Sequence, residues 1–341
     1  QPDSNKLITS VDDENFIPSN KIINIKFLIQ TTMKKVTKLA MLLLAGTLST
    51  GFVSCSSSDD VTPSPLVTEE QQTTLEQAES ASKANAQKTE MGKIISNYLD
   101  AVIKPTYQDL ANKADVLYKT CQNLYQKRKA GTLTQNDIDA ACAAFKDARR
   151  DWEQSEAFLY GAATDNQIDP HIDSWPLDHS QLTQALNNAD VIAGITGENP
   201  AKYVYENNSN FDSVLGFHGL EFVLFRNGQN RTVAAFNAEK ETEAGLTSVK
   251  TIDEAAFAVA VAGDLRNMTY LLEYGWLGLS TPTSHQEQLA NAMWVINGTR
   301  YHGLSAKNIP YRDFLRYATT EQGWFPTWHE ALQNIFDGGC G

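Results

Sequence analysis

Apolar residues recur at helical spacing along most of the chain from about residue 69 onward. No segment of useful length alternates with the two-residue period of a strand, and the valine-rich stretch 257–261 is interleaved with alanine. The pattern therefore predicts an all-α protein. The expected helices cover residues 69–90, 91–128 with a kink near Pro105, 136–160, 176–189, 211–226, 251–277, 284–300 and 308–336.

A polar connection rich in asparagine and glycine, residues 194–210, separates two groups of these helices. About 275 residues follow the N-terminal segment described below, which is enough for two domains of ordinary size. We therefore expect an N-terminal helical domain at 68–205 and a C-terminal helical domain at 206–341.

The N-terminal part of the chain has the features of a bacterial export signal. Residues 1–32 show no usable period, and we expect them to be upstream sequence outside the native protein. From Met33 a stretch with three lysines precedes the apolar run Leu39–Leu48, which is too short to span a membrane. The run ends in small residues before Cys55, a pattern that resembles a lipobox. We expect a signal peptide at 33–54 and lipid attachment at Cys55.

The segment 55–67 is rich in serine, aspartate and proline, and is expected to be a flexible tether. A serine after the cysteine, with acidic residues behind it, resembles the surface-exported lipoproteins of bacteroidetes. The apolar run Leu39–Leu48 could instead be a buried core helix. The three lysines before it and the polar tract after it argue against that alternative. We therefore predict an outer-membrane lipoprotein of the cell envelope, anchored by lipid and facing the periplasm or the cell surface.

The first candidate for chemistry is a pair, His218 and Glu221, within the predicted helix 211–226. Residues three apart on a helix project side by side, so the imidazole and the carboxylate can bind one metal ion. The alternative is a structural histidine, because such a pair is expected about once by chance in a chain of this composition.

A second pair, Glu153 and Glu156, lies near the end of the predicted helix 136–160, beside Trp152. A solvated acidic face is the ordinary explanation for two such carboxylates. Like charges partly shielded from water are costly, however, unless a cation or protons lie between them. This pair is therefore a second candidate for metal binding.

A third cluster of acidic residues lies in a proline-containing loop before the next helix, which Pro176 is well placed to start. The loop carries Asp169, His171 and Asp173, and Asp169 competes with Asp173 as a donor. The combined donors suit iron, manganese or zinc. The predicted metal ligands are His218, Glu221, Glu153, Glu156 and Asp173.

These three segments, in this order and spacing, resemble the imelysin family. The family has a tryptophan–glutamate segment, a D-x-W-P segment and a G-x-H-x-x-E signature, and the resemblance covers about residues 68 to 337. The matching residues here are Trp152, Glu153, Glu156, Asp173, Trp175, Pro176, Gly216, His218 and Glu221.

The resemblance implies two helical-bundle-like domains, with the signature lining a cleft between them. Some family members are insulin-cleaving metallopeptidases, while others look like metal-binding proteins of iron uptake or like polysaccharide-binding proteins. Members from bacteroidetes are typically lipoproteins. The resemblance therefore implies a metal site and a fold more strongly than it implies one reaction.

Composition separates the remaining function classes. The net charge of −13 argues against binding to a nucleic-acid backbone. The sequence has no H-E-x-x-H motif, and a site with one histidine and up to four carboxylates suits iron, manganese or calcium better than a peptidase zinc. We expect a protein that binds a divalent or ferric metal, free or within a larger ligand, with a possible uptake partner at the cell surface. A metallopeptidase and a polysaccharide-binding lipoprotein are the alternatives, and no catalytic residue is assigned.

Cys121 and Cys142 lie almost symmetrically about the predicted turn at Gly131. In an antiparallel helical hairpin they lie opposite one another, so a disulfide is feasible in an oxidising compartment. Two packed apolar thiols are an equal alternative.

Overall fold

The computed structural model describes residues 66–341 apart from 244, 293–294, 297–298, 301–302 and 338–341. The predicted upstream segment, signal peptide and lipid-attachment residue Cys55 lie outside the described residues, as does most of the predicted tether. Leu66, near the end of that tether, is buried in the hydrophobic core, so core packing includes a residue that was expected to be in the tether.

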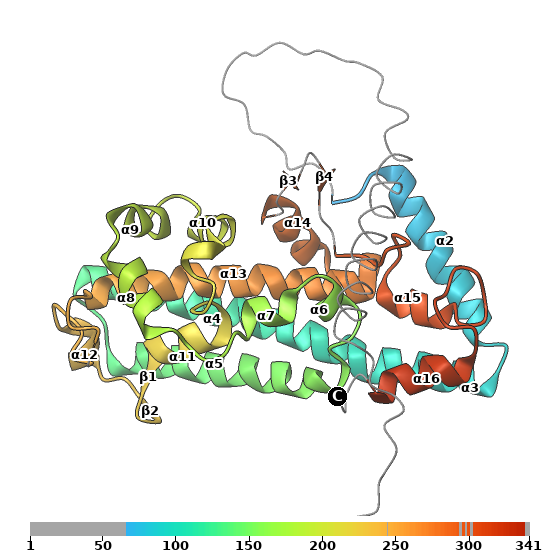
Figure 1. The fold of residues 1–341 in the computed structure, drawn as a ribbon, viewed down its shortest axis with the longest axis horizontal. Coiled ribbons are helices and arrows are strands. Elements are labelled where there is room, and N and C mark those ends of the chain that lie inside the picture. The colour runs from blue at the N-terminus through green and yellow to red at the C-terminus, as the bar shows by residue number, and fades with distance from the viewer. Residues whose placement is uncertain (1–65, 244, 293–294, 297–298, 301–302, 338–341) are drawn as a thin grey trace, which may run out of the picture. The chain divides into compact units, whose positions relative to one another are not determined.

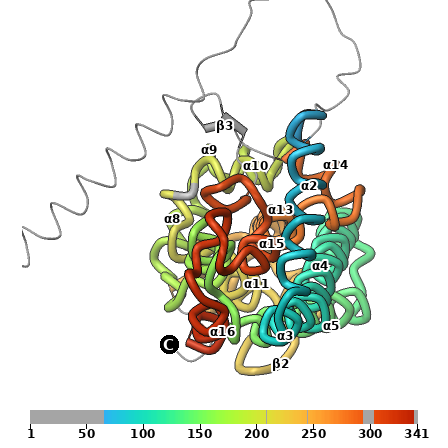
Figure 2. Tube along the Cα trace, turned by 90° about the vertical axis from the view of Figure 1, so that its right-hand side faces the viewer, coloured from blue at the N-terminus to red at the C-terminus, as the bar shows by residue number. Residues whose placement is uncertain are grey.

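The structure is organised around one long buried helix, α13 (Thr251–Leu277), drawn in orange in Figure 1. Nearly all of its side chains are buried, because apolar residues occur on every side of the helix. It packs along α4 (Lys104–Ala130), which in turn packs against α5 (Gln135–Ser155). Figure 2 shows these helices stacked side by side.

Shorter helices cover the remaining faces of α13, among them α10 (Pro200–Glu206) and α11 (Gly216–Leu224). The other helices are α2 (Glu69–Ala86), α3 (Glu90–Tyr98), α6 (Ala162–Asp165), α7 (Ile168–Ile172), α8 (His179–Asn187), α9 (Ala189–Ile195), α12 (Val233–Asn237), α14 (Thr283–Ala292), α15 (Tyr311–Arg316) and α16 (Trp328–Asp337). Within the described residues, strands are limited to two hairpins, β1 (Phe225–Arg226) with β2 (Gln229–Asn230) and β3 (Val295–Ile296) with β4 (Thr299–Arg300). The all-α prediction is confirmed.

Several predicted helix boundaries were wrong, and the capping residues of the helices explain most of the differences. Asn188 and Asn199 serve as N-caps of α9 and α10, so the polar stretch expected to be a connection is partly helical. The helix expected from 176 begins at His179, because the Asp178 side chain accepts hydrogen bonds from the amides of Ser180 and Gln181. Near Pro105, where a kink was expected, a π-helical turn joins α3 to α4 (Leu99–Ile103).

The C-terminal helices were also predicted too long. The helix expected at 284–300 ends at Ala292, before the β3–β4 hairpin. The helix expected at 308–336 is divided into α15 and α16. The helix expected at 211–226 runs only from Gly216 to Leu224.

A cleft between two domains is not confirmed. Helices α4 and α10, from the predicted N-terminal half, pack directly along α13, from the predicted C-terminal half. The boundary at residue 205 stays a prediction. In the part of the chain that the structure describes, no helix has both the length and the apolar character needed to cross a bilayer.

Cys121 and Cys142 are buried free thiols in this structure. Burial raises the pKa of each to about 12. The Cys142 thiol lies 3.5 Å from the backbone oxygen of Leu224, which is consistent with a weak hydrogen bond to α11. Cys121 and Cys142 are therefore two packed thiols in this structure, which is the second of the two alternatives.

Buried charges next to α11 hold the end of this helix against α13. The Arg231 guanidinium, 1% exposed, lies 2.8 Å from the carboxylate of Glu241 and 3.1 Å from that of Glu254 on α13. Arg231 also donates to the backbone oxygen of Val223 in α11 at 3.0 Å. Neither carboxylate is open to water, and Arg226 also pairs with both, so the two arginines together compensate the two carboxylates.

Arg231→Met is expected to lower the free energy of unfolding by about 3 kcal/mol, because it leaves Glu254 without its closest positive charge. Urea denaturation followed by circular dichroism measures the change. The control is Lys93→Met, which removes an exposed pair with Glu90 (2.7 Å) and should change stability by less than about 0.5 kcal/mol. Equal losses in the two variants would contradict the role given to Arg231.

Candidate metal site

A glycine allows the helix that carries His218 and Glu221 to approach the segment that carries Asp173. Gly216, the first residue of α11, has a φ of +64°, and a Cβ built there would lie 1.8 Å from the backbone oxygen of Ile172. Only glycine fits this position, because any side chain meets both the strained backbone and the Ile172 carbonyl. The start of α11 therefore lies against the end of α7, next to Asp173.

The carboxylate of Asp173 is the centre of a hydrogen-bonded network. One oxygen, Oδ2, accepts from Trp152 Nε1 at 2.7 Å. The other, Oδ1, lies 3.0 Å from His218 Nε2 and also accepts from the Arg149 guanidinium. Since its side chain is only 12% exposed, these donors replace most of its water.

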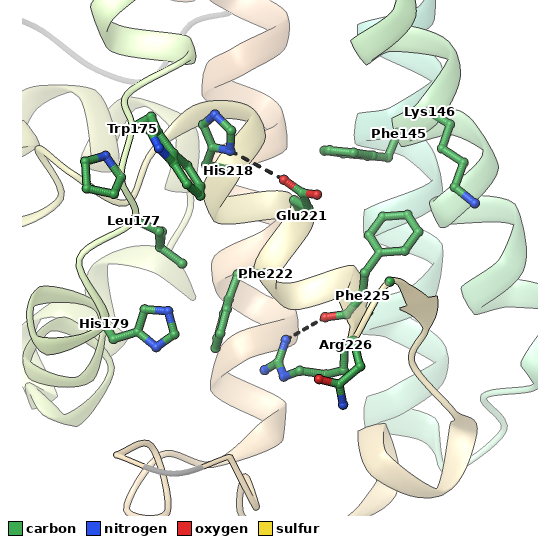
Figure 3. Close-up of a pocket in the computed structure, with 13 residues that line it drawn as sticks. Phe145, Lys146, Trp175, Leu177, His179, His218, Glu221, Phe222, Phe225 and Arg226 are labelled. Carbon is green, nitrogen blue, oxygen red and sulfur yellow. Dashed lines mark hydrogen bonds and ion pairs between the residues drawn. The ribbon is translucent and has the colours of Figure 1, made fainter.

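This network also orients the imidazole of His218. A carboxylate can only accept, so His218 donates its Nε2–H to Asp173, and in the neutral ring Nδ1 carries the lone pair. Nδ1 is buried, and within the described residues it has no hydrogen-bond partner. It lies 3.4 Å from Oε2 of Glu221, whose side chain is 55% exposed (Figure 3).

The distance between these two atoms fits a shared metal ion. With metal–ligand bonds of about 2.1 Å, two donors this far apart meet at an angle of about 108°, close to tetrahedral. The angle also lies within the range open to flexible coordination spheres of oxygen and nitrogen. The distance between His218 Nδ1 and Glu221 Oε2 is therefore compatible with one shared ion.

Glu153 and Asp173 already share a fixed positive charge. The Arg149 guanidinium lies 2.5 Å from Oε1 of Glu153 and pairs with Asp173, while it also lies 5.2 Å over the ring of Phe217. Arg149 was not among the predicted site residues. Its position four residues before Glu153 on one helix is the signal that could have found it.

Glu156 lies beside this network without joining it through an ion pair that the structure shows. Its residue is exposed, yet partial desolvation raises the pKa of its carboxyl, and the charges of Glu153 and Asp173 raise it further. Burial also raises the pKa of Asp169, again with a contribution from Asp173. It is Asp173, rather than Asp169, that contacts His218.

The five predicted ligands thus lie in one region but do not form one coordination sphere in this structure. Among the residues described, no group of three or more histidine, cysteine, aspartate or glutamate side chains could hold a metal ion. The described residues offer two facing donors, from His218 and Glu221. Asp173 and Arg149 support the first of these donors.

A pocket of about 650 Å³ opens beside the two donors (Figure 3). Trp175, 72% exposed, forms one wall, with its ring centre 4.6 Å from that of His218. The lining is mainly apolar and aromatic, with several basic groups: Phe145, Lys146, Trp175, Pro176, Leu177, His179, His218, Glu221, Phe222, Phe225, Arg226, Asn227 and Gly228. Such a pocket has the size and apolar character of small-molecule sites.

Residues 103–305, more than half of the chain, match the imelysin family model. The chain belongs to the imelysin family. The matched residues include all of the network around Asp173 and the pair formed by His218 and Glu221. Gly216, at the close approach, and the two facing donors lie within the matched range.

The chain is also similar to proteins whose names refer to iron. Iron-regulated protein A of Synechococcus elongatus is 31% identical over 131 residues, which cover 38% of this chain and 31% of that protein. A solved structure from Parabacteroides distasonis, described as a "putative iron-regulated protein A precursor", is 25% identical. That match covers 68% of this chain and 56% of the solved one, with a TM-score of 0.44. The chain thus spans about a third and about half, respectively, of these two proteins.

Gly216→Ala is expected to lower the free energy of unfolding by about 3 kcal/mol or more, because the methyl group meets the Ile172 carbonyl as well as the strained φ. Gly131→Ala is the matched control. Gly131 has a φ of +69° with nothing within 4 Å of the place that a Cβ would take, so only the backbone strain of about 1 kcal/mol applies. Chemical denaturation of both variants measures the difference, and equal losses would contradict the close approach.

Proposed function

We propose that this protein binds a divalent or ferric metal at the cell envelope, in a role related to iron uptake, and that His218 and Glu221 hold the ion. The observation that carries the proposal is the buried Nδ1 atom of His218. Within the described residues this atom has no hydrogen-bond partner, and it lies 3.4 Å from a carboxylate oxygen. A buried nitrogen lone pair without a partner is costly unless a ligand uses it.

The contact between Asp173 and His218 supports the same proposal. A carboxylate that accepts from one ring nitrogen of a histidine fixes the ring and makes the other nitrogen a better metal ligand. Asp173 therefore acts as a positioning residue, while His218 and Glu221 provide the ligands. Glu153 and Glu156 add negative charge nearby, which favours a cation.

The number of donors favours binding over peptidase activity. Catalytic zinc sites usually provide three protein ligands and one water. Two protein donors in the described residues leave most coordination positions for groups that the ion brings with it, which suits a protein that captures its metal as cargo. The iron-related name of the Synechococcus relative supports iron as that metal. Attachment through Cys55 to the outer membrane and an uptake partner at the cell surface remain part of this proposal.

His218→Ala and Glu221→Ala are each expected to weaken metal binding at least tenfold, because each removes one of two facing donors. Asp173→Asn should weaken it by about 10- to 100-fold, because it disturbs the orientation of the imidazole. Equilibrium dialysis with anaerobic Fe²⁺, Mn²⁺ and Zn²⁺, followed by elemental analysis, measures the affinities.

His179→Ala is the control, since His179 lines the same pocket but contacts Phe222 (5.0 Å between ring centres) and lies outside the network. It should retain wild-type affinity. Metal affinity that stays unchanged in both His218→Ala and Glu221→Ala would overturn the proposed site.

A protease assay separates the binding protein from the metallopeptidase. We expect insulin chains to remain intact after incubation with protein saturated in turn with each of the three metals, because the described residues offer no third protein ligand at the site. Mass spectrometry detects cleavage. Turnover by the wild type that disappears in His218→Ala and in Glu221→Ala would establish the peptidase instead.

A further inference from the structure

The lining of the pocket beside His218 holds more basic than acidic residues, although the protein as a whole is strongly acidic. Its lining contains two residues with permanent positive charge, Lys146 and Arg226, and two histidines, against the single acidic residue Glu221. The whole chain has a net charge of −13. Whether this lining can attract an anion depends on which of its basic groups lack a carboxylate partner.

Lys146 supplies the available charge. Arg226 is already bound to Glu241 at 2.8 Å and to Glu254 at 3.3 Å, so its charge is largely compensated. Lys146 is exposed on α5, with its ammonium 5.2 Å from the ring centre of Phe225. In the described part of the chain no carboxylate forms an ion pair with it.

The walls of the pocket are aromatic. The rings of Phe145 and Phe225 lie 5.4 Å apart on the side of α5, and Trp175 lies on the opposite side (Figure 3). Phe222, which also lines the pocket, lies between them in this view (Figure 3). Flat rings of a ligand stack well against such surfaces, because ring faces and edges attract one another beyond their buried area.

The two proposed metal donors lie in the wall of the pocket, so an ion bound there is also in contact with the pocket. The two donors of His218 and Glu221 leave most coordination positions of an ion open, and both residues line the pocket. A metal that arrives as a complex can fill those positions with the oxygens of its own ligand. The organic part of that ligand then lies between the aromatic walls.

We propose that the cargo is a metal complex of an aromatic, anionic chelator, such as a phenolate or catecholate acid. The metal binds His218 Nδ1 and Glu221, the rings stack within the pocket, and the negative charge of the chelator pairs with Lys146. This inference rests on the proposed metal-binding function and adds the class of ligand.

The test compares two ferric complexes that differ in the aromatic character of the chelator. The full-length chain is dialysed against radioactive iron as the 2,3-dihydroxybenzoate complex, which is aromatic and anionic, or as the nitrilotriacetate complex, which is aliphatic and anionic. The aromatic complex is expected to bind at least tenfold more tightly. Free 2,3-dihydroxybenzoate should bind more weakly than its ferric complex.

Lys146→Met should weaken binding of the aromatic complex about tenfold and leave the affinity for Fe²⁺ alone unchanged. Lys129→Met is the matched control. Lys129 is also an exposed lysine over an aromatic ring, 4.7 Å from the centre of Tyr125, but it lies outside the pocket. This variant should bind both complexes as the wild type does.

The outcomes distinguish this inference from the proposed function. Equal affinity for the two complexes, or full binding of the aromatic complex by Lys146→Met, would overturn the chelator while Fe²⁺ binding through His218 still stood. Tight binding of the aromatic complex that persists in His218→Ala would show a pocket for an aromatic anion alone, and would overturn the metal complex as cargo.

Discussion

The site depends on the interaction between the Asp173 carboxylate and its three donors, Trp152, Arg149 and His218. A poorly exposed carboxylate is stable only when hydrogen bonds and positive charge replace its water. Because one of those donors is His218 Nε2, satisfying Asp173 also determines which nitrogen of His218 is left to bind a ligand. The same contact thus stabilises the fold and prepares the proposed chemistry. The position of Asp173 is in turn set by its neighbours in the chain. His171, two residues earlier, lies 2.7 Å from the fully buried carboxylate of Asp264 on α13, which ties α7 to the central helix.

Much of the fold could be predicted from the sequence, because long amphipathic or wholly apolar helices have a strong period. The range predicted for α13 agrees with the structure, and α5 differs mainly at its ends. The connection at 194–210 was misjudged because Asn199 and Pro200 are typical both of loops and of a helix start. Short helices with such caps carry too few apolar residues for a period to be recognised.

The candidate site could be predicted as a set of residues but not as an arrangement. Spacing on one helix pairs His218 with Glu221, and this is the pair that faces the pocket. Spacing cannot show that Arg149 bridges Glu153 and Asp173, because that contact joins α5 to the residue after α7. For the same reason the sequence could not distinguish a ligand from a residue that positions one, as Asp173 does for His218. The guanidinium of Arg149 already pairs with both Glu153 and Asp173. Few carboxylates of this cluster in the described part are therefore left as metal donors.

The central claim is that Asp173 holds His218 with its hydrogen on Nε2 and its lone pair on Nδ1. Nuclear magnetic resonance of protein labelled with ¹⁵N in histidine measures this directly, and comparison with His218→Ala assigns the signals. At a pH where the ring is neutral, we predict a protonated Nε2 and an unprotonated Nδ1 for His218. We also predict that Zn²⁺ shifts the Nδ1 signal and that Asp173→Asn alters the balance between the two ring forms. A neutral His218 with its hydrogen on Nδ1, unchanged by Asp173→Asn, would contradict the claim.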